Sequence, residues 1–212
     1  MRFNKTCAIV AGGAFAAAAS AQTFDVVGGK TSVDLDFALL DAAAGLDFAQ
    51  VVGPVIAPGD LGDDSVAFPI NARDGSLPTT FSYEAGLASF SGAIEHAGGV
   101  EFNTGAVTVG DFTIGFDGDR ASGAVSGFFV ESTLSINAIL FDVANPNVIQ
   151  ADAGGLIIEG DLWVSPEFAG FLGDTALTGA NVGEARIDAL VPAPGAMAAL
   201  GLGGLLAARR RR

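Results

Sequence analysis

Few residues of this chain have side chains suited to chemistry. The sequence holds one histidine, His96, and one cysteine, Cys7. A single histidine cannot make a zinc site, and the remaining ligands would be carboxylate or carbonyl oxygens, which suit hard cations. A lone histidine near a strand end is most often a turn or surface residue, so this is what we expect of His96.

Two acidic loops supply the oxygen atoms that a calcium ion would need. The aspartates are Asp60, Asp63 and Asp64 in one loop and Asp117 and Asp119 in another. Neither loop has the Asp-x-Asp-x-Asp-Gly spacing with a distant glutamate. Aspartate is also frequent in turns because it hydrogen-bonds its own backbone. These five residues are therefore calcium candidates, and the sequence does not identify a metal.

The sequence favours a protein without catalytic activity. It contains no Gly-x-Ser-x-Gly elbow, His-Glu-x-x-His motif, phosphate-binding loop or dinucleotide fingerprint. A glycosidase with paired carboxylates stays a third alternative, because separation in sequence does not give separation in space. Trp163 is expected in the core, although an exposed tryptophan could stack on a sugar ring.

The elements that would position these residues are mainly β-strands. Residues 33–39 alternate apolar and small or acidic side chains with a period of two, which predicts a half-buried strand. Further short runs rich in Phe, Val, Ile, Thr and Leu are separated by Gly, Asp and Asn, and they are 48–56, 66–70, 79–83, 87–95, 99–102, 106–116, 122–131, 133–142, 156–164 and 184–190. This spacing predicts an all-β fold, an antiparallel β-sandwich or an open barrel.

One short helix and several turns interrupt the strands. Ser165-Pro166-Glu167 combines an N-cap residue, a proline at the first helical position and an acid in the first turn, so a helix is expected over 166–172. Residues 117–119 form the expected hairpin turn between two strands. Pro69 should place its strand at a sheet edge or end that strand.

Charge is distributed very unevenly along the chain. Residues 22–190 contain all 24 acidic residues but only four basic ones, a formal charge of −20. This segment, about 170 residues long, suffices for one domain with a buried core. An acidic surface repels nucleic acid, so we expect no nucleic-acid partner.

The N-terminal residues 1–21 have the pattern of a signal peptide. Arg2 and Lys5 precede an apolar stretch at 8–18, and Ala19 and Ala21 flank Ser20 in an A-x-A cleavage site. Signal peptidase would then cut after Ala21, and an uncleaved N-terminal anchor is the alternative. Because Cys7 lies in the removed segment, the mature chain would have no thiol and no disulfide.

The C-terminal residues 191–212 have the pattern of a membrane segment followed by a cytoplasmic stop. Val191-Pro192-Ala193-Pro194 precedes an uncharged run at 195–208, and the chain ends with Arg209, Arg210, Arg211 and Arg212. A helix over 195–208 would rise about 21 Å against a hydrocarbon core of about 30 Å. The helix comes near spanning length if residues from 190 onward are included and the arginines extend into the cytoplasmic interface.

This tail resembles the PEP-CTERM protein-sorting domain, in which Val-Pro-Glu-Pro is followed by an apolar helix and an arginine cluster. Ala193 occupies the position of the family's glutamate. The resemblance implies an exosortase-type processing enzyme as a partner, passage through the inner membrane, and final release or attachment at the cell surface. It also implies a setting in which extracellular polysaccharide is made, and polysaccharide is therefore a further expected partner.

A second resemblance concerns His96. The segment His96-Ala-Gly-Gly-Val-Glu-Phe102, with the strand region 107–116 after it, resembles the His-x-Gly-Gly hairpins of HtaA-type surface domains, some of which bind haem. Tyr83 is the only tyrosine. The resemblance implies His96 as a haem contact, and Tyr83, as the only tyrosine, is the candidate second contact.

Together these patterns predict an exported, non-enzymatic component of the cell surface or extracellular matrix. No cofactor is required by this interpretation. A surface module that binds haem or calcium is the alternative, and a carbohydrate-active enzyme is the third.

Overall fold

The computed structural model describes residues 22–192. Within this range most of the chain is β-strand. The strands are β1 (Thr23–Asp25), β2 (Gly28–Leu35), β3 (Phe48–Val52), β4 (Val66–Pro69), β5 (Ser82–Glu84), β6 (Phe90–Ser91), β7 (Ile94–Glu95), β8 (Gly99–Phe102), β9 (Val107–Gly110), β10 (Phe112–Phe116), β11 (Val125–Ser132), β12 (Ala138–Asp152), β13 (Gly155–Val164) and β14 (Asn181–Leu190). The helices are α1 (Phe37–Ala44), α2 (Pro166–Leu172) and the 3₁₀ turns η1 (Ala85–Leu87), η2 (Asn103–Gly105), η3 (Gly118–Arg120) and η4 (Thr175–Leu177). The prediction of a mostly β, antiparallel fold is confirmed.

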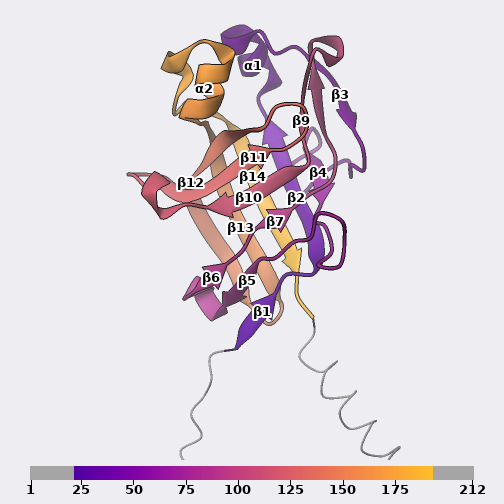
Figure 1. Cartoon of the computed structure of the whole chain (residues 1–212), viewed down its shortest axis with the longest axis vertical. Helices are drawn as coiled ribbons and strands as arrows, with labels where there is room; N and C mark the ends of the chain where they lie inside the picture. The colour runs from indigo at the N-terminus through magenta and orange to yellow at the C-terminus, as the bar shows by residue number, and fades with distance from the viewer. Residues whose placement is uncertain (1–21, 193–212) are drawn as a thin grey trace, which may run out of the picture.

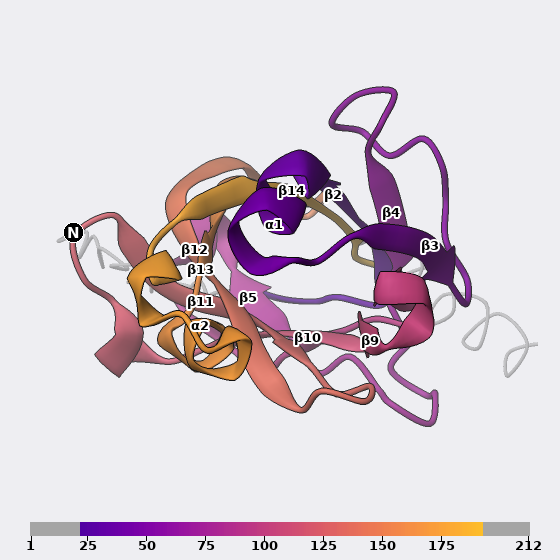
Figure 2. The ribbon, with the colours of Figure 1, turned by 90° about the horizontal axis from the view of Figure 1, so that it is seen from above.

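The central element is an eight-stranded antiparallel sheet in the order β4-β2-β14-β13-β12-β11-β10-β7. Figures 1 and 2 show this sheet curling around an interior, with α1 and α2 at one end. The curl brings the two edge strands together. Ile70 after β4 forms an antiparallel bridge with His96 after β7, and the Asn71 N–H donates to the Glu95 carbonyl at 2.7 Å. We call this junction the seam.

Two three-stranded sheets close the interior. The order is β1-β5-β6 in one and β3-β8-β9 in the other. The first packs with one buried cluster, which includes Phe24, Phe81 and Tyr83. The second packs with another cluster, which includes Val100 and Phe102 from β8 and Phe168 from α2. The interior therefore has two hydrophobic layers along its length.

The helix α2 has the predicted bounds and the predicted cap. The Ser165 hydroxyl accepts a hydrogen bond from the Phe168 N–H at 3.0 Å, and Pro166 occupies the first turn. Gly173 ends the helix in the left-handed conformation. Phe168 and Ala169 are buried, so the cap fixes the helix over the core.

Removing this cap gives the first prediction. Ser165 is completely buried, and its hydroxyl also donates to the Ile139 carbonyl at 2.6 Å. Ser165→Ala should therefore lower the free energy of unfolding by about 1 to 2 kcal/mol, measured by urea denaturation. Ser122→Ala, at an exposed serine, is the control and should change it by less than about 0.5 kcal/mol. Equal effects of the two variants would contradict the assigned role of the cap.

The structure corrects the sequence prediction at residues 33–39. The strand β2 ends at Leu35, and α1 begins at Phe37. The Asp36 carboxylate accepts from the Leu39 N–H at 2.8 Å and so caps the helix, and Gly45 ends it in the left-handed conformation. The sequence of α1 is rich in Ala and Leu, which favour helix, and this preference prevails over the period-two pattern.

A second correction concerns residues 143–152. The strand predicted to end at residue 142 continues as β12 to Asp152 and passes through Pro146. Pairing with β11 ends at Ala144, whereas pairing with β13 continues to the end of the strand. Pro146 is tolerated because β12 has only one neighbour there, and the register shifts beside it.

The chain enters and leaves the curled sheet at the same end. The Val27 N–H donates to the Leu190 carbonyl at 2.9 Å, and Gly28 pairs with Leu190. Figure 1 shows β1 and the last residues of β14 at the end opposite α1 and α2. None of the helices in residues 22–192 is long and apolar enough to span a membrane. The proposed span at 195–208 lies outside the described residues.

Candidate functional site

His96 lies in the interior of the protein, at the seam. Its side chain is 1% exposed, which contradicts the expectation of a surface or turn residue. Its Nε2 lies 2.7 Å from the Thr31 hydroxyl of β2, and its Nδ1 lies 2.9 Å from the Phe112 carbonyl of β10. In the neutral ring, Nδ1–H donates to the carbonyl, which leaves Nε2 to accept from Thr31. His96 thus connects the two halves of the curled sheet.

Burial lowers the pKa of His96 to about 4, against a smaller opposing effect of the hydrogen bond to Phe112. The imidazole is therefore neutral at physiological pH. Both of its nitrogens are engaged within the protein, so neither is directed at a ligand. The role of His96 in this structure is to hold the seam.

Tyr83 is also buried, at 1% exposure, in the hydrophobic cluster that packs with the β1-β5-β6 sheet. Its hydroxyl donates to the Asp152 carbonyl at 2.8 Å and so ties β5 to the β12–β13 hairpin. Burial, followed by the nearby Asp152 carboxylate, raises the pKa of Tyr83 to about 12. A tyrosine that binds haem iron does so as the phenolate, and the raised pKa disfavours this form.

We therefore expect no haem binding through these two residues. Adding haem to the protein should produce no saturable shift of the Soret band. If a shift occurs, it should survive His96→Gln and Tyr83→Phe, because the two side chains are enclosed. A Soret shift that His96→Gln abolishes would contradict this prediction and restore the haem alternative.

Two of the five calcium candidates, Asp60 and Asp117, have carboxylates that accept hydrogen bonds within the protein. The other three, Asp63, Asp64 and Asp119, are exposed. The Asp60 carboxylate accepts from Lys30 Nζ at 2.8 Å, and this hydrogen bond is the largest cause of the lowered pKa of Asp60. Asp117 caps the turn at η3 by accepting from the Asp119 N–H at 3.0 Å. Asp64 lies at the end of a pocket described below. Among residues 22–192 no three His, Cys, Asp or Glu side chains are grouped to hold a metal ion.

Trp163 faces the outer side of the sheet. It is half-buried on β13, between Asp142 of β12 and Asn181 of β14. Its indole N–H is buried and has no hydrogen-bond partner. The expectation of a core position is thus met only in part.

The positive charges of the described residues all pair with acids. Lys30 contacts Asp60, Arg73 contacts Asp25, Arg120 contacts Asp142 and Glu167, and Arg186 contacts Glu159 and Asp188. Most of these pairs join separate strands or join a strand to a loop or helix. The four basic side chains therefore form ion pairs that stabilise the fold. The acidic residues in excess of them leave the surface negatively charged.

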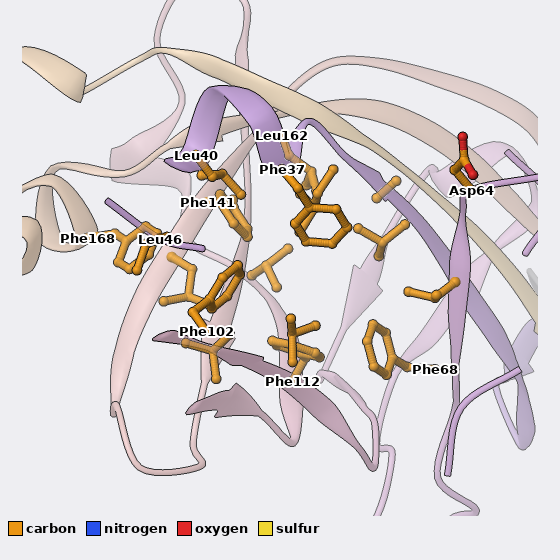
Figure 3. Close-up of a pocket in the computed structure, with 18 residues that line it drawn as sticks. Phe37, Leu40, Leu46, Asp64, Phe68, Phe102, Phe112, Phe141, Leu162 and Phe168 are labelled. Carbon is orange, nitrogen blue, oxygen red and sulfur yellow. The ribbon is translucent and has the colours of Figure 1, made fainter. Parts of the chain in front are cut away.

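Sequence reasoning missed an apolar cavity of about 50 Å³ under α1. Its walls come from the curled sheet, from β8 and β9, and from both helices. Figure 3 shows phenylalanine side chains around it, from Phe168 at one end to Phe68 at the other. Asp64 is the only charged residue among those lining it, and it lies at the Phe68 end. The excess of phenylalanine, 16 residues in the chain, was the available sequence signal, but it does not show where space remains.

Two of the predicted sorting residues lie in the described part of the chain. Val191 is half-buried and packs against the hydrophobic cluster of the β1-β5-β6 sheet. Pro192 follows it in an exposed position. The others lie outside the described residues; they are Ala19, Ala21, Ala193, Pro194, Arg209, Arg210, Arg211 and Arg212.

Comparison of the chain with protein-family models, with curated proteins and with solved structures finds no match.

Proposed function

We propose that the chain is an exported, non-enzymatic component of the cell surface or extracellular matrix, delivered by its PEP-CTERM-like tail. Signal peptidase would remove residues 1–21, and an exosortase-type enzyme would process the tail at the inner membrane. The mature domain would then reside at the surface or outside the cell, where extracellular polysaccharide is an available partner.

One observation carries the proposal. The strand β14 lies in the middle of the eight-stranded sheet, between β2 and β13, and it ends at Leu190, directly before the Val-Pro-Ala-Pro residues. A tail attached at this point can be removed without loss of a strand. The N-terminal residue of the described chain lies at the same end, so α1 and α2 would face away from a membrane that held the tail.

The side-chain contacts support a structural rather than a catalytic role. The polar side-chain atoms of His96 and Tyr83 form hydrogen bonds to other strands. The four basic residues of the domain likewise pair with acids of the same domain.

A fusion experiment tests the delivery signal. Residues 192–212 are attached to an unrelated exported reporter, and we expect a membrane-associated stage followed by trimming. The matched control replaces Arg209, Arg210, Arg211 and Arg212 with serine, which removes the positive charges that hold the end in the cytoplasm. A reporter that fractionates as a soluble periplasmic protein without trimming would overturn the proposal. The intact mass of the native protein recovered from cells then locates both cleavage points.

A further inference from the structure

The strand β3 is an edge strand whose outer side is open. The order in its sheet is β3-β8-β9, so β3 pairs with β8 alone. Within residues 22–192 no backbone hydrogen bond joins Phe48–Val52 to any segment other than β8. Figures 1 and 2 both show β3 at the margin of the molecule. Because alternate N–H and C=O groups of an edge strand point away from its neighbour, β3 presents free backbone groups at the surface.

The other sheet edges are closed or shorter. On the outer side of β4, the Ile56 N–H and carbonyl both bond to Ala67 at 2.8 Å. The Gly110 carbonyl at the end of β9 accepts from the Thr133 and Leu134 N–H groups. The chain after β7 joins the chain after β4 at the seam, and β1 and β6 have only three and two residues. Of the edge strands in the three sheets, β3 is therefore the longest, and its outer side is open.

The second half of β12 is a further exposed edge, but more of its backbone is engaged. This half pairs with β13 and no longer with β11. The Asn145 N–H donates to the Ala124 carbonyl at 2.9 Å, and Pro146 has no N–H. At the other end, the Asp152 carbonyl accepts from the Tyr83 hydroxyl. A further strand could therefore pair only with the middle of this segment.

The open edge lies in the longest uncharged stretch of residues 22–192. Residues 48–59 contain no Asp, Glu, Lys or Arg, and Asp47 and Asp60 flank them. Residues 22–190, by contrast, carry a formal charge of −20. Native proteins often protect an edge strand with charged side chains, lysine above all. The strand β3 lacks this protection, although charged residues are frequent elsewhere in the domain.

This charge distribution restricts the partner of the edge. Like charges directly opposite each other in a sheet are destabilising, and a basic segment would gain more from the acidic surface than from a neutral edge. The matching partner is a neutral strand with free backbone groups, and a second copy of this chain presents one. Identical edges pair antiparallel about a two-fold axis, so that each satisfies the other.

The sequence of β3 is compatible with this pairing. After the register shift between Phe48 and Gln50, the residues Gln50, Val51 and Val52 pair regularly with β8. A two-fold axis at Val51 sets Val51 opposite its own copy and Gln50 opposite Val52, so no charged residue meets another. Two β-branched residues opposite each other favour pairing. Phe48, which is 39% exposed, adds apolar surface at the start of the strand.

We propose that the open edge of β3 pairs antiparallel with the β3 edge of a second copy, which joins two β3-β8-β9 sheets into one. Each copy contributes a five-residue strand, and such a contact buries less than the roughly 1,200 Å² of a standard interface. The dimer is therefore weak, with a dissociation constant above about 10 µM, and it forms where the protein is concentrated. This pairing does not depend on the route by which the protein is delivered.

Sedimentation velocity of the purified full chain between about 5 and about 500 µM measures the association. We expect a shift from monomer toward dimer, with slower hydrogen exchange at alternate amides of Phe48–Val52 in the concentrated sample. Raising NaCl from about 0.05 to about 0.5 M should strengthen the association at least about threefold, because salt screens the repulsion between two acidic domains. A monomer at every concentration, unchanged exchange in β3, or dissociation on adding salt would overturn the proposal.

Lysine substitutions locate the contact. Ala49→Lys places a charge at an exposed position of β3 and should weaken the association at least about tenfold, a difference of about 1.4 kcal/mol. Ala42→Lys at an exposed position of α1 and Val148→Lys in the second half of β12 are the controls and should leave it unchanged. Every variant keeps residues 193–212, so a difference among the variants does not come from the tail.

Circular dichroism checks that each variant folds. If Ala49→Lys does not fold, Gln50→Lys at the next exposed position replaces it. Association that the β3 lysine leaves intact, that Val148→Lys abolishes, or that all the lysines weaken equally would show that β3 is not the contact and overturn the proposal.

Discussion

Lowering the pH from 7 to 5 is expected to reduce the free energy of unfolding by about 2 kcal/mol through His96 alone. Burial lowers the folded-state pKa of His96 to about 4, whereas the unfolded value is about 6.5. Between these values the unfolded chain binds a proton that the folded chain does not. Stability therefore falls as the pH falls through this window, and above about pH 7 the side chain has no further effect.

The single histidine makes this prediction specific. Residues 22–192 contain no cysteine and no second histidine, so His96 is the one side chain in that range with an unperturbed pKa between pH 5 and 8. The carboxylates with lowered pKa values, Asp60, Asp152 and Glu167, titrate below this window. Their contribution should appear only at lower pH.

Urea denaturation at pH 7, 6 and 5 measures the effect. The matched variant is His96→Gln, which keeps an amide for the Thr31 and Phe112 contacts but does not titrate. It should be less stable at pH 7, with a free energy of unfolding that changes by less than about 0.5 kcal/mol down to pH 5. A pH dependence that is the same in both proteins would show that His96 is not the responsible group.

Arg120→Met should lower the free energy of unfolding by about 3 kcal/mol. Arg120 Nε donates to the Asp142 carboxylate at 2.8 Å, and both side chains are largely buried, at 15% and 12% exposure. Its Nη1 and Nη2 donate to the two carboxylate oxygens of Glu167. The guanidinium also lies 5.9 Å from the centre of the Phe129 ring. The hydrogen bonds that Arg120 donates to Glu167 and Asp142 raise the pKa of its guanidinium further. Without Arg120, the Asp142 charge would stay in a poorly solvated position.

A double-mutant cycle separates this cost from lost packing. Asp142→Asn in the Arg120→Met background should restore about 2 kcal/mol, because no charge is then left unpaired. Glu167→Gln alone should cost less than about 1 kcal/mol, since the Glu167 side chain is 43% exposed. If Glu167→Gln costs more than Arg120→Met, or the double variant recovers nothing, the buried pair is not the source of the effect.

Local patterns determined much of the secondary structure. The predicted strand over 99–102 and the predicted helix over 166–172 have the observed bounds, because each combines suitable residues with clear boundaries. The placement of Pro69 at the end of an edge strand also holds, since a proline cannot donate to a further neighbour. These features depend on residues adjacent in sequence.

Where local patterns competed, the sequence prediction failed. Residues 33–39 satisfied a strand pattern, but the Ala- and Leu-rich sequence of α1 favours helix, and Asp36 and Gly45 supply its caps. The continuation of β12 through Pro146 depends on its pairing with β13, and the residues of that segment alone do not predict this pairing. At β12, tertiary pairing therefore overrides the local propensity.

The sequence by itself determined an acidic, strand-rich domain between two segments whose patterns predict export. Only the tertiary structure decided where His96 and Tyr83 lie. The curl of the sheet joins strands far apart in sequence, and it thereby buries the two side chains that the sequence left open as ligands. The same curl encloses the apolar cavity under α1. Neither result follows from the sequence, because both depend on which strands close the sheet, and closure is a property of the whole chain.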